Sequence, residues 1–113
     1  LVSGGFTFFT ERLKQRLGFD DTLSNELEIR DGRLTGGLVG NIVGARAKAA
    51  RFREVALGMQ REHTVAIGDG ANDLQMMAEA GTSVAYRAKP VVKAKASCAL
   101  DYAGLDGVVH LFE

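Results

Sequence analysis

Hydrophobic residues recur along much of this chain at helical spacing, three or four positions apart. This spacing predicts a first helix over residues 6–17, ended by Gly18, and we expect its apolar face to point into a core. A second stretch, residues 44–59, traces one apolar face in the same way. The residues that define the two faces are Phe6, Phe9, Leu13 and Leu17 in the first stretch and Ala49, Phe52, Val55, Ala56 and Met59 in the second.

The C-terminal half alternates short apolar runs with helical patterns. Residues 63–67 read as a buried strand that stops at Gly68, and residues 82–86 and 97–100 read as two further strands. Between the first two strands we expect a helix that continues to Ala80 and is stopped by Gly81. Pro90 suits the first turn of another helix, and the last residues are weakly helical.

The stretch ELEIRDGRLTG predicts a β-hairpin. Leu27 and Ile29 alternate with charged residues, Asp31 and Gly32 form a strong two-residue turn, and Leu34 continues on the far side. Such a hairpin can be a flap over a site or a purely structural element, and its pattern does not distinguish the two.

Strands that alternate with helices predict an α/β fold. We expect part of a doubly wound, Rossmann-like parallel sheet with helices on both faces and the hairpin as a flap. Ligands of such sheets lie at the carboxyl ends of the strands. The two polar stretches SGGFT and GDGAND are both predicted to fall at that edge.

Composition limits the function classes. The 113 residues suffice for one small domain, and their 14 basic and 14 acidic side chains give a formal net charge of zero. No broad electrostatic field therefore attracts nucleic acid or a membrane surface, and any phosphate chemistry must be local. Cys98 is the one cysteine, which excludes an internal disulfide and favours a reducing compartment, for which we expect the cytoplasm.

GDGAND, residues 68–73, is the sharpest chemical signal. Asp69 and Asp73 are four positions apart across a predicted strand-to-helix junction, so both carboxylates can face one point. Two carboxylates with no basic residue between them favour a hard cation such as Mg²⁺. Asn72 can serve a phosphate or a neighbouring carboxylate. The bland alternative is a glycine turn followed by ordinary helix-capping residues.

The chain opens with LVSGGFT, where we expect Ser3, Gly4 and Gly5 to form a turn at the start of a helix. A hydroxyl and free N–H groups at a helix N-terminus bind phosphate oxygens, although Ser3 could instead be a plain helix cap. A cation would complete such a site. Lys48 is the candidate, but spacing alone does not prefer it to Arg46 or Arg51.

These stretches, in this order, resemble the later part of the phosphoserine phosphatases, in the superfamily of haloacid dehalogenase-type hydrolases. SGGFT is similar to the second motif of that family, the Lys of ARAKA to its third motif, and GDGANDLQMM to its fourth. SNELEIRDGRLTG resembles the family's hairpin, and YRAKP follows the expected strand. The resemblance extends over essentially all of residues 1–113, which we expect to be the C-terminal part of one catalytic domain.

The resemblance implies phosphoryl transfer through an aspartyl-phosphate, assisted by Mg²⁺, with O-phosphoserine as the substrate in the last step of serine synthesis. Ser3 and Gly4 would hold the phosphate, and Asn72 would hydrogen-bond near it. Lys48 would stabilise the charge of the phosphate and of the nucleophile. Asp69 would coordinate Mg²⁺ and Asp73 would support that coordination.

The family's first motif, Asp-x-Asp-x-Thr, and its helical cap have no counterpart in this sequence. That motif supplies the nucleophile, from a strand between those that carry SGGFT and GDGAND. Only about two residues precede the predicted turn at Ser3, which we interpret as the remainder of a longer strand. We therefore expect a missing N-terminal segment as partner, poor solubility or self-association such as a homodimer, weak Mg²⁺ binding and no hydrolysis by the chain alone.

Two other functions stay open at this point. The chain could belong to a different small-molecule phosphatase or phosphotransferase of the superfamily, since GDG-x-ND does not decide the substrate. It could also be a catalytically inactive module that binds phosphate or Mg²⁺.

Overall fold

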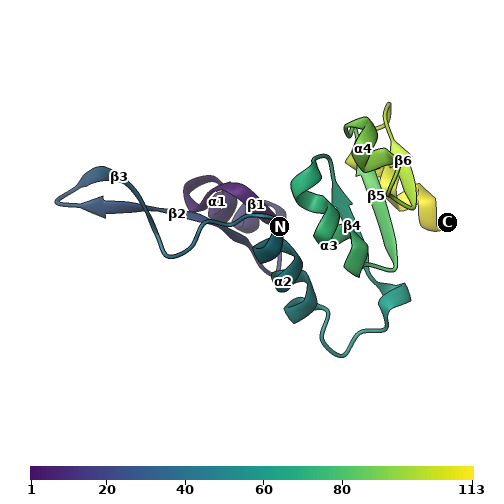
Figure 1. Ribbon diagram of the computed structural model, residues 1–113, viewed down its shortest axis with the longest axis horizontal. Coiled ribbons are helices and arrows are strands. Elements are labelled where there is room, and N and C mark those ends of the chain that lie inside the picture. Colours follow the sequence, from purple (N-terminus) through teal and green to yellow (C-terminus); the bar gives the residue numbers. More distant parts are fainter.

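The computed structural model describes all residues, 1–113, as an elongated α/β molecule of 51 × 33 × 27 Å. Figure 1 shows a β-hairpin that projects from one end and a second sheet at the other end, with helices between them. The strands form two three-stranded sheets, in the orders β1-β2-β3 and β4-β5-β6. The predicted α/β class is confirmed, with the sheet in two separate parts.

The first sheet combines β1 (Val2–Phe6), β2 (Leu23–Arg30) and β3 (Arg33–Val39). β2 pairs in parallel with β1 and antiparallel with β3. The predicted hairpin is confirmed, because Asp31 and Gly32 adopt φ angles of 52° and 75° between β2 and β3. These left-handed conformations are the ones that a two-residue hairpin turn requires.

The second sheet is parallel throughout and consists of β4 (Val65–Gly68), β5 (Thr82–Tyr86) and β6 (Cys98–Leu100). β5 lies in the middle, and Ser83, Val84 and Ala85 are buried. The end of β4 lies beside the end of β5, with Gly68 opposite Ala85. Residues that follow β4 and β5 therefore emerge at the same edge.

The helices lie close to their predicted places. They are α1 (Thr7–Leu17), α2 (Ala45–Val55), α3 (Leu74–Glu79) and α4 (Pro90–Lys93), the last with Pro90 in its first turn as expected. Short 3₁₀ segments span Arg61–His63, Ala71–Asp73 and Leu105–Phe112. Gly18, with φ of 72°, ends α1, whereas α2 ends four residues earlier than its apolar pattern suggests.

The buried core lies where α2 and α3 pack beside the second sheet. It contains seven apolar residues: Ala49, Ala66, Met76, Met77, Ala80, Ala85 and Val92. Gly81, which the sequence predicted only as a helix stop, also lies against the backbone of another segment. Its φ is not left-handed, but a Cβ there would lie 2.2 Å from the backbone oxygen of Arg61. The close approach of two backbones explains the glycine.

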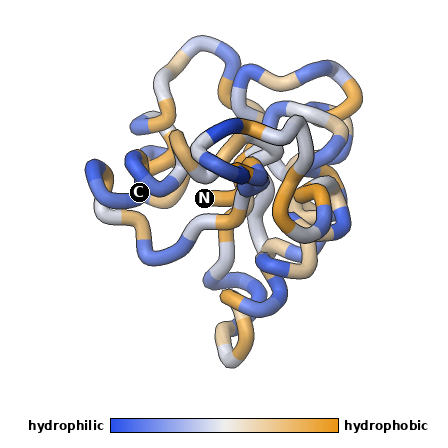
Figure 2. The backbone as a smooth tube through the Cα atoms, turned by 90° about the vertical axis from the view of Figure 1, so that its left-hand side faces the viewer, coloured by the Kyte–Doolittle hydropathy of each residue, from blue (hydrophilic) through white to orange (hydrophobic).

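The expected burial of the α1 face is wrong in this structure. Phe9 and Leu17 are 61% and 60% exposed, and the one buried residue of the helix is Thr10. β4 is likewise only half covered, because Val65 and Ile67 are 40% and 38% exposed while Ala66 is buried. Figure 2 shows the result, with apolar segments distributed along the outer parts of the chain. Helical spacing predicted the elements correctly, but no partner covers these faces.

The predicted turn at Ser3-Gly4-Gly5 is also wrong, because β1 runs through it to Phe6 and α1 begins at Thr7. β1 has five residues, an ordinary strand length, so the interpretation of Leu1 and Val2 as a shortened strand loses its basis. The pairing of β1 with β2 shifts register between Val2 and Phe6. Within this irregular stretch the backbone N–H of Gly5 donates to Ser3 Oγ at 2.9 Å.

No helix in the molecule has the length and apolar character of a membrane span.

Candidate active site

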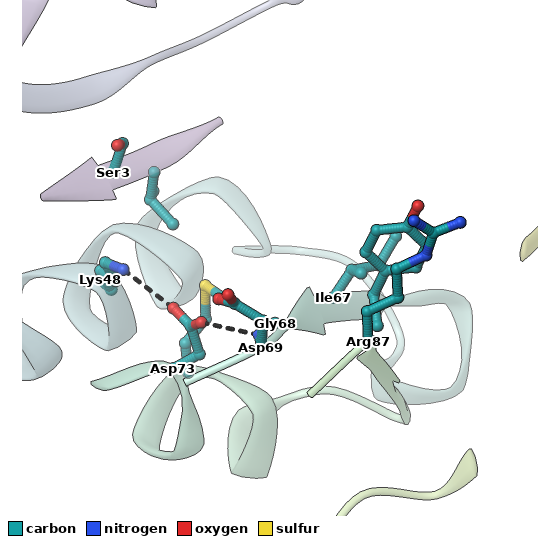
Figure 3. Close-up of a pocket in the computed structure, with 10 residues that line it drawn as sticks. Ser3, Lys48, Ile67, Gly68, Asp69, Asp73 and Arg87 are labelled. Carbon is teal, nitrogen blue, oxygen red and sulfur yellow. Dashed lines mark hydrogen bonds and ion pairs between the residues drawn. The ribbon is translucent and has the colours of Figure 1, made fainter. Parts of the chain in front are cut away.

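A cavity of about 380 Å³ opens between the first residues of β1 and the carboxyl end of β4, and it collects most of the predicted site residues. Ser3 reaches it from β1, Lys48 from α2, and Asp69 and Asp73 from the loop after β4. Figure 3 shows Lys48 directed at Asp73, with Asp69 close by and Ser3 above them. The structure thus brings Ser3 of SGGFT together with Asp69 and Asp73 of GDGAND, although Ser3 lies near the start of β1 and not at its carboxyl end.

The loop after β4 is folded around the Asp73 carboxylate. The backbone N–H groups of Asp69 and Gly70 donate to Asp73 Oδ2 at 3.1 and 3.3 Å. A Cβ at Gly68 would lie 2.5 Å from the Asp73 Cβ, so glycine is required there for steric reasons. The GDGAND sequence therefore forms a tight loop that holds one carboxylate against its own backbone.

Lys48 and Asp73 form a buried ion pair, with 2.9 Å between Lys48 Nζ and Asp73 Oδ1. The residues are only 5% and 6% exposed. Burial by itself would raise the pKa of Asp73. The hydrogen bond from Lys48, the two backbone N–H groups and the charge of Lys48 outweigh that effect and hold the pKa of Asp73 below its usual value.

The structure distinguishes among the three cations of α2 that the sequence left open. Arg46 is exposed and lies outside the cavity lining. Arg51 lies within 3.7 Å of Asp21 and 3.5 Å of Glu54, away from the cavity. Lys48 is therefore the only one of the three that lines the cavity.

Asp69 differs from Asp73, since its carboxylate is exposed and takes part in no hydrogen bond or ion pair within the protein. No group of three or more His, Cys, Asp or Glu side chains gathers anywhere in the molecule. Mg²⁺ is commonly held by one or two carboxylates together with waters and substrate phosphate oxygens. The Asp69 carboxylate is free, whereas that of Asp73 accepts three hydrogen bonds within the protein. This arrangement fits a Mg²⁺ site in which the protein supplies one or two carboxylates and the other ligands are waters and phosphate oxygens.

Gly4 and Asn72 do not line the cavity. The carbonyl of Gly4 accepts a hydrogen bond from Asn25 at 2.9 Å, and Asn72 is exposed on the 3₁₀ segment. The structure thus gathers four of the six predicted site residues and leaves these two at the periphery.

Asn25 is a residue of this region that the sequence reading overlooked. It is 6% exposed, and its side-chain oxygen accepts the N–H of Val43 at 2.8 Å while its amide nitrogen donates to Gly4. The side chain thereby connects β1 with the segment that leads into α2. The signal available in the sequence was an amide side chain in alternation with the apolar residues Leu27 and Ile29. Tyr86 and Arg87 also line the cavity. They come at the end of β5, which lies beside the end of β4.

An apolar groove of about 520 Å³ continues from the cavity along β1 and β4. Leu1, Val65 and Ala66 line it, and Val2 and Ile67 line both spaces. Neither β1 nor β4 has a hydrogen-bonded strand on this side. The order along the chain is the same in both segments, because Leu1 lines the groove and Ser3 the cavity, while Val65 and Ala66 line the groove and Gly68 the cavity. The two segments therefore run in the same direction.

Comparison with known proteins gives one family model and a consistent set of relatives. The model described as haloacid dehalogenase-like hydrolase matches residues 1–78, more than half of the chain. A phosphoserine phosphatase of Vibrio cholerae serotype O1 is 51% identical over 111 residues, which cover 96% of this chain and 34% of that relative.

Solved structures agree with this result. A crystal structure of a probable phosphoserine phosphatase from Vibrio cholerae, unliganded, superposes with a TM-score of 0.91 at 52% identity, covering 96% of this chain and 34% of that one. A phospho-aspartyl intermediate analogue of phosphoserine phosphatase gives 0.89 at 38% identity, covering 97% and 54%. The chain therefore spans about a third to a half of the proteins it resembles.

Proposed function

This chain belongs to the haloacid dehalogenase-like hydrolase family, and from that premise we propose that it is part of a Mg²⁺-dependent phosphatase that hydrolyses O-phosphoserine to serine and phosphate. The observation that carries the proposal is the buried Lys48–Asp73 pair beside the free Asp69 carboxylate at one cavity. The named activity of relatives at about half identity supports the choice of substrate.

Four polar residues of the cavity have proposed roles. Lys48 donates one of its three N–H bonds to Asp73, so two remain for phosphoryl oxygens. The ion pair with Asp73 holds this buried ammonium in place. Ser3 would add a hydroxyl donor from the opposite strand. Asp69, with support from Asp73, would hold Mg²⁺, which stabilises negative charge on a transferring phosphoryl group when it is bound.

Gly4 and Asn72 stand further from the cavity than the other residues. We propose that they contribute only where a bound phosphate extends beyond the space described here, with the Gly4 backbone and the Asn72 amide as donors. Their contribution should accordingly be smaller than that of Lys48.

The nucleophile is proposed to be an aspartate from another segment, as the phospho-aspartyl analogue of a relative suggests. Its carboxylate oxygen attacks phosphorus, the bond from phosphorus to the serine oxygen breaks, and that oxygen takes up a proton. Water then attacks the same phosphorus, which releases phosphate and restores the carboxylate. No Asp-x-Asp-x-Thr sequence occurs in this chain.

The apolar groove supports the idea that such a segment enters as a strand. β1 and β4 both offer unpaired backbone groups along it, and unpaired parallel edges readily accept an additional strand. The buried Nε of Arg51, a groove residue, has no hydrogen-bond partner and could donate to the incoming backbone. A strand that runs with its neighbours would end at the cavity, beside Lys48 and Asp69. We propose that residues 1–113 and this strand form one catalytic domain, active in the cytoplasm.

The test joins this chain to the part of the Vibrio cholerae relative that precedes the region matched here, and measures phosphate release from O-phosphoserine with and without Mg²⁺. We expect Mg²⁺-dependent hydrolysis. Lys48→Met should lower kcat/KM by about 100-fold or more, because a charge that stabilises the transition state is removed. Arg46→Met, on the exposed side of the same helix, is the matched control and should retain activity.

The outcomes separate the competing functions. Release of phosphate from other small phosphomonoesters but not from O-phosphoserine would point to a different phosphatase of the family. Phosphate and Mg²⁺ binding without hydrolysis in the joined protein would indicate an inactive binding module and contradict the proposal.

A further inference from the structure

Asn25 is a buried polar side chain that the roles assigned above do not use. Its amide makes two contacts with the backbone: Nδ2 donates to the Gly4 carbonyl at 2.9 Å, and Oδ1 accepts the N–H of Val43 at 2.8 Å. An amide side chain supplies both the donor and the acceptor that these two backbone groups need. The two segments are also in close contact, since a Cβ at Gly4 would lie 3.8 Å from the Val43 carbonyl oxygen.

Each of the two connected segments leads to a residue of the proposed phosphate site. Gly4 directly follows Ser3 in β1. Val43 comes two positions before α2, and Lys48 lies in the first turn of that helix. Asn25 therefore connects the segment of Ser3 with the start of the helix that carries Lys48, and both of these side chains line the cavity.

The two segments depend on this connection to different degrees. α2 is fixed by other contacts, because Ala49 belongs to the buried core and Lys48 is paired with Asp73. In β1, by contrast, no residue is buried, and the pairing with β2 shifts register within the strand. We therefore expect Ser3 to be displaced when the connection is lost, while Lys48 stays in place.

The hydroxyl group of Ser3 is oriented by its own local contact. The backbone N–H of Gly5 donates to Ser3 Oγ at 2.9 Å, which occupies one lone pair of the oxygen and leaves the O–H hydrogen for a phosphoryl oxygen. A phosphoryl group that contacts Lys48 can accept this hydrogen only if β1 lies at a suitable distance from α2. The two hydrogen bonds of Asn25 fix that distance.

We propose that Asn25 is a positioning residue, which holds the Ser3 hydroxyl at a distance from Lys48 that lets one phosphoryl group contact both. This inference rests on the proposed function and deepens it, because it adds a residue outside the cavity lining to the phosphate-binding residues. Asn25 acts through Ser3 and does not touch the phosphate. Its loss should therefore weaken phosphate binding only as far as Ser3 contributes to that binding.

A double-mutant cycle tests this dependence. Binding of inorganic phosphate in the presence of Mg²⁺ is measured by isothermal titration calorimetry on the joined protein described above, as wild type, Asn25→Ala, Ser3→Ala and the double variant. Each single substitution should weaken binding by about 10-fold, because a hydrogen bond to a charged group is lost. The double variant should bind within about 2-fold of Ser3→Ala. A combined loss of about 100-fold would overturn the proposal, since Asn25 would then act independently of Ser3.

Ser24→Ala is the matched control, because Ser24 precedes Asn25 in β2 and its hydroxyl makes a part-buried hydrogen bond with Thr10 at 2.6 Å. This substitution should lower stability and leave the affinity for phosphate unchanged. Asn25→Asp takes the place of Asn25→Ala if the alanine variant does not fold. It keeps the size of the side chain and the acceptor for Val43, but its ionised carboxylate cannot donate to Gly4.

Binding of Mg²⁺ alone, measured on the same proteins, separates positioning from a general loss of structure. Asp69 follows β4 in the other sheet, so the affinity for Mg²⁺ should be the same in the wild type and in the Asn25 variants. Equal losses of Mg²⁺ and phosphate affinity, or no binding of phosphate by the wild type, would overturn the assignment. Hydrolysis of O-phosphoserine is a separate measurement. The proposed function can therefore hold while this inference fails, and a protein that binds phosphate without hydrolysis can still support the inference.

Discussion

The two sheets of this molecule differ sharply in how well they are packed. The middle of β5 is fully enclosed, with Val84 and Ala85 at 0% exposure, while six of the seven residues of β3 are exposed. Yet the candidate active site draws on both, with Ser3 from the first sheet and Asp69 from the second. Asp69 and Asp73 thus follow a strand of the enclosed sheet, whereas Ser3 lies in a sheet with few buried residues.

This contrast shows what holds the site together across the groove. Besides the apolar packing of α2 with α3, the connections at the polar end are the Lys48–Asp73 pair between α2 and the loop after β4, and Asn25 between β1 and the approach to α2. At the apolar end the ion pair is that of Arg51 with Asp21, at 3.7 Å and partly exposed. A strand inserted there would pair with the edges of both β1 and β4 and would join the two sheets by backbone hydrogen bonds.

The largest expected effect comes from breaking the connection between the halves. Lys48→Met leaves the Asp73 carboxylate buried without a cation, so the free energy of unfolding should fall by about 3–5 kcal/mol. Urea unfolding followed by circular dichroism measures this. The double variant Lys48→Met with Asp73→Asn should recover most of the loss. If the single and double variants are equally unstable, the uncompensated charge is not the cause.

Asn25→Ala should have the next largest effect, a loss of about 2–3 kcal/mol, because the Gly4 carbonyl and the Val43 N–H lose their partner. Amide hydrogen exchange should show faster exchange in β1 with β4–β6 little changed. Thr35→Ala, whose hydroxyl contacts only Glu28 and Gly37 in the exposed hairpin, is the control. If amide exchange became equally faster in both sheets, the first sheet would not respond separately from the second.

A pair of truncations tests the packing difference directly. Val84→Ala in the enclosed β5 should cost about 2 kcal/mol from lost burial and the cavity left behind. Leu34→Ala, at 64% exposure in β3, should change stability by less than about 0.5 kcal/mol. Thermal unfolding of the two variants against the wild type is sufficient. Similar losses for both would mean that the hairpin is covered in solution.

The smallest effect is expected from pH. Because the folded-state pKa of Asp73 lies below its unfolded value, the stabilisation from its ionised form is complete above about pH 4. It is lost as the pH falls through the lower folded-state pKa. Unfolding midpoints between pH 2 and pH 6 should therefore decline on the acid side, and less steeply in Asp73→Asn. An identical slope in that variant would assign the acid sensitivity to other carboxylates.

Local chemistry decided the features that the sequence predicts correctly. The turn at Asp31-Gly32, the start of α4 at Pro90 and the span of β5 depend on dihedral preferences and short-range patterns. The position of GDGAND at a strand end follows from an apolar run that stops at a glycine. These features are readable because they need only a few neighbouring residues.

Burial and partnership were decided by the tertiary structure alone. The spacing of Phe9 and Leu17 is that of a core helix, yet both are exposed, because burial requires a partner from elsewhere in the molecule. Ser3 lies in a strand rather than a turn, since pairing with β2 extends β1 past the glycines.

By itself, then, the sequence determined the order and kind of the elements and the residue types that can bind phosphate and Mg²⁺. Only the tertiary structure decided that Lys48 faces the cavity in preference to Arg46 or Arg51, that Asp73 is engaged while Asp69 is free, and which unpaired edges flank the groove. The physical reason is distance along the chain. Lys48 and Asp73 are 25 residues apart, and no local pattern encodes which of several charges a folded backbone brings together.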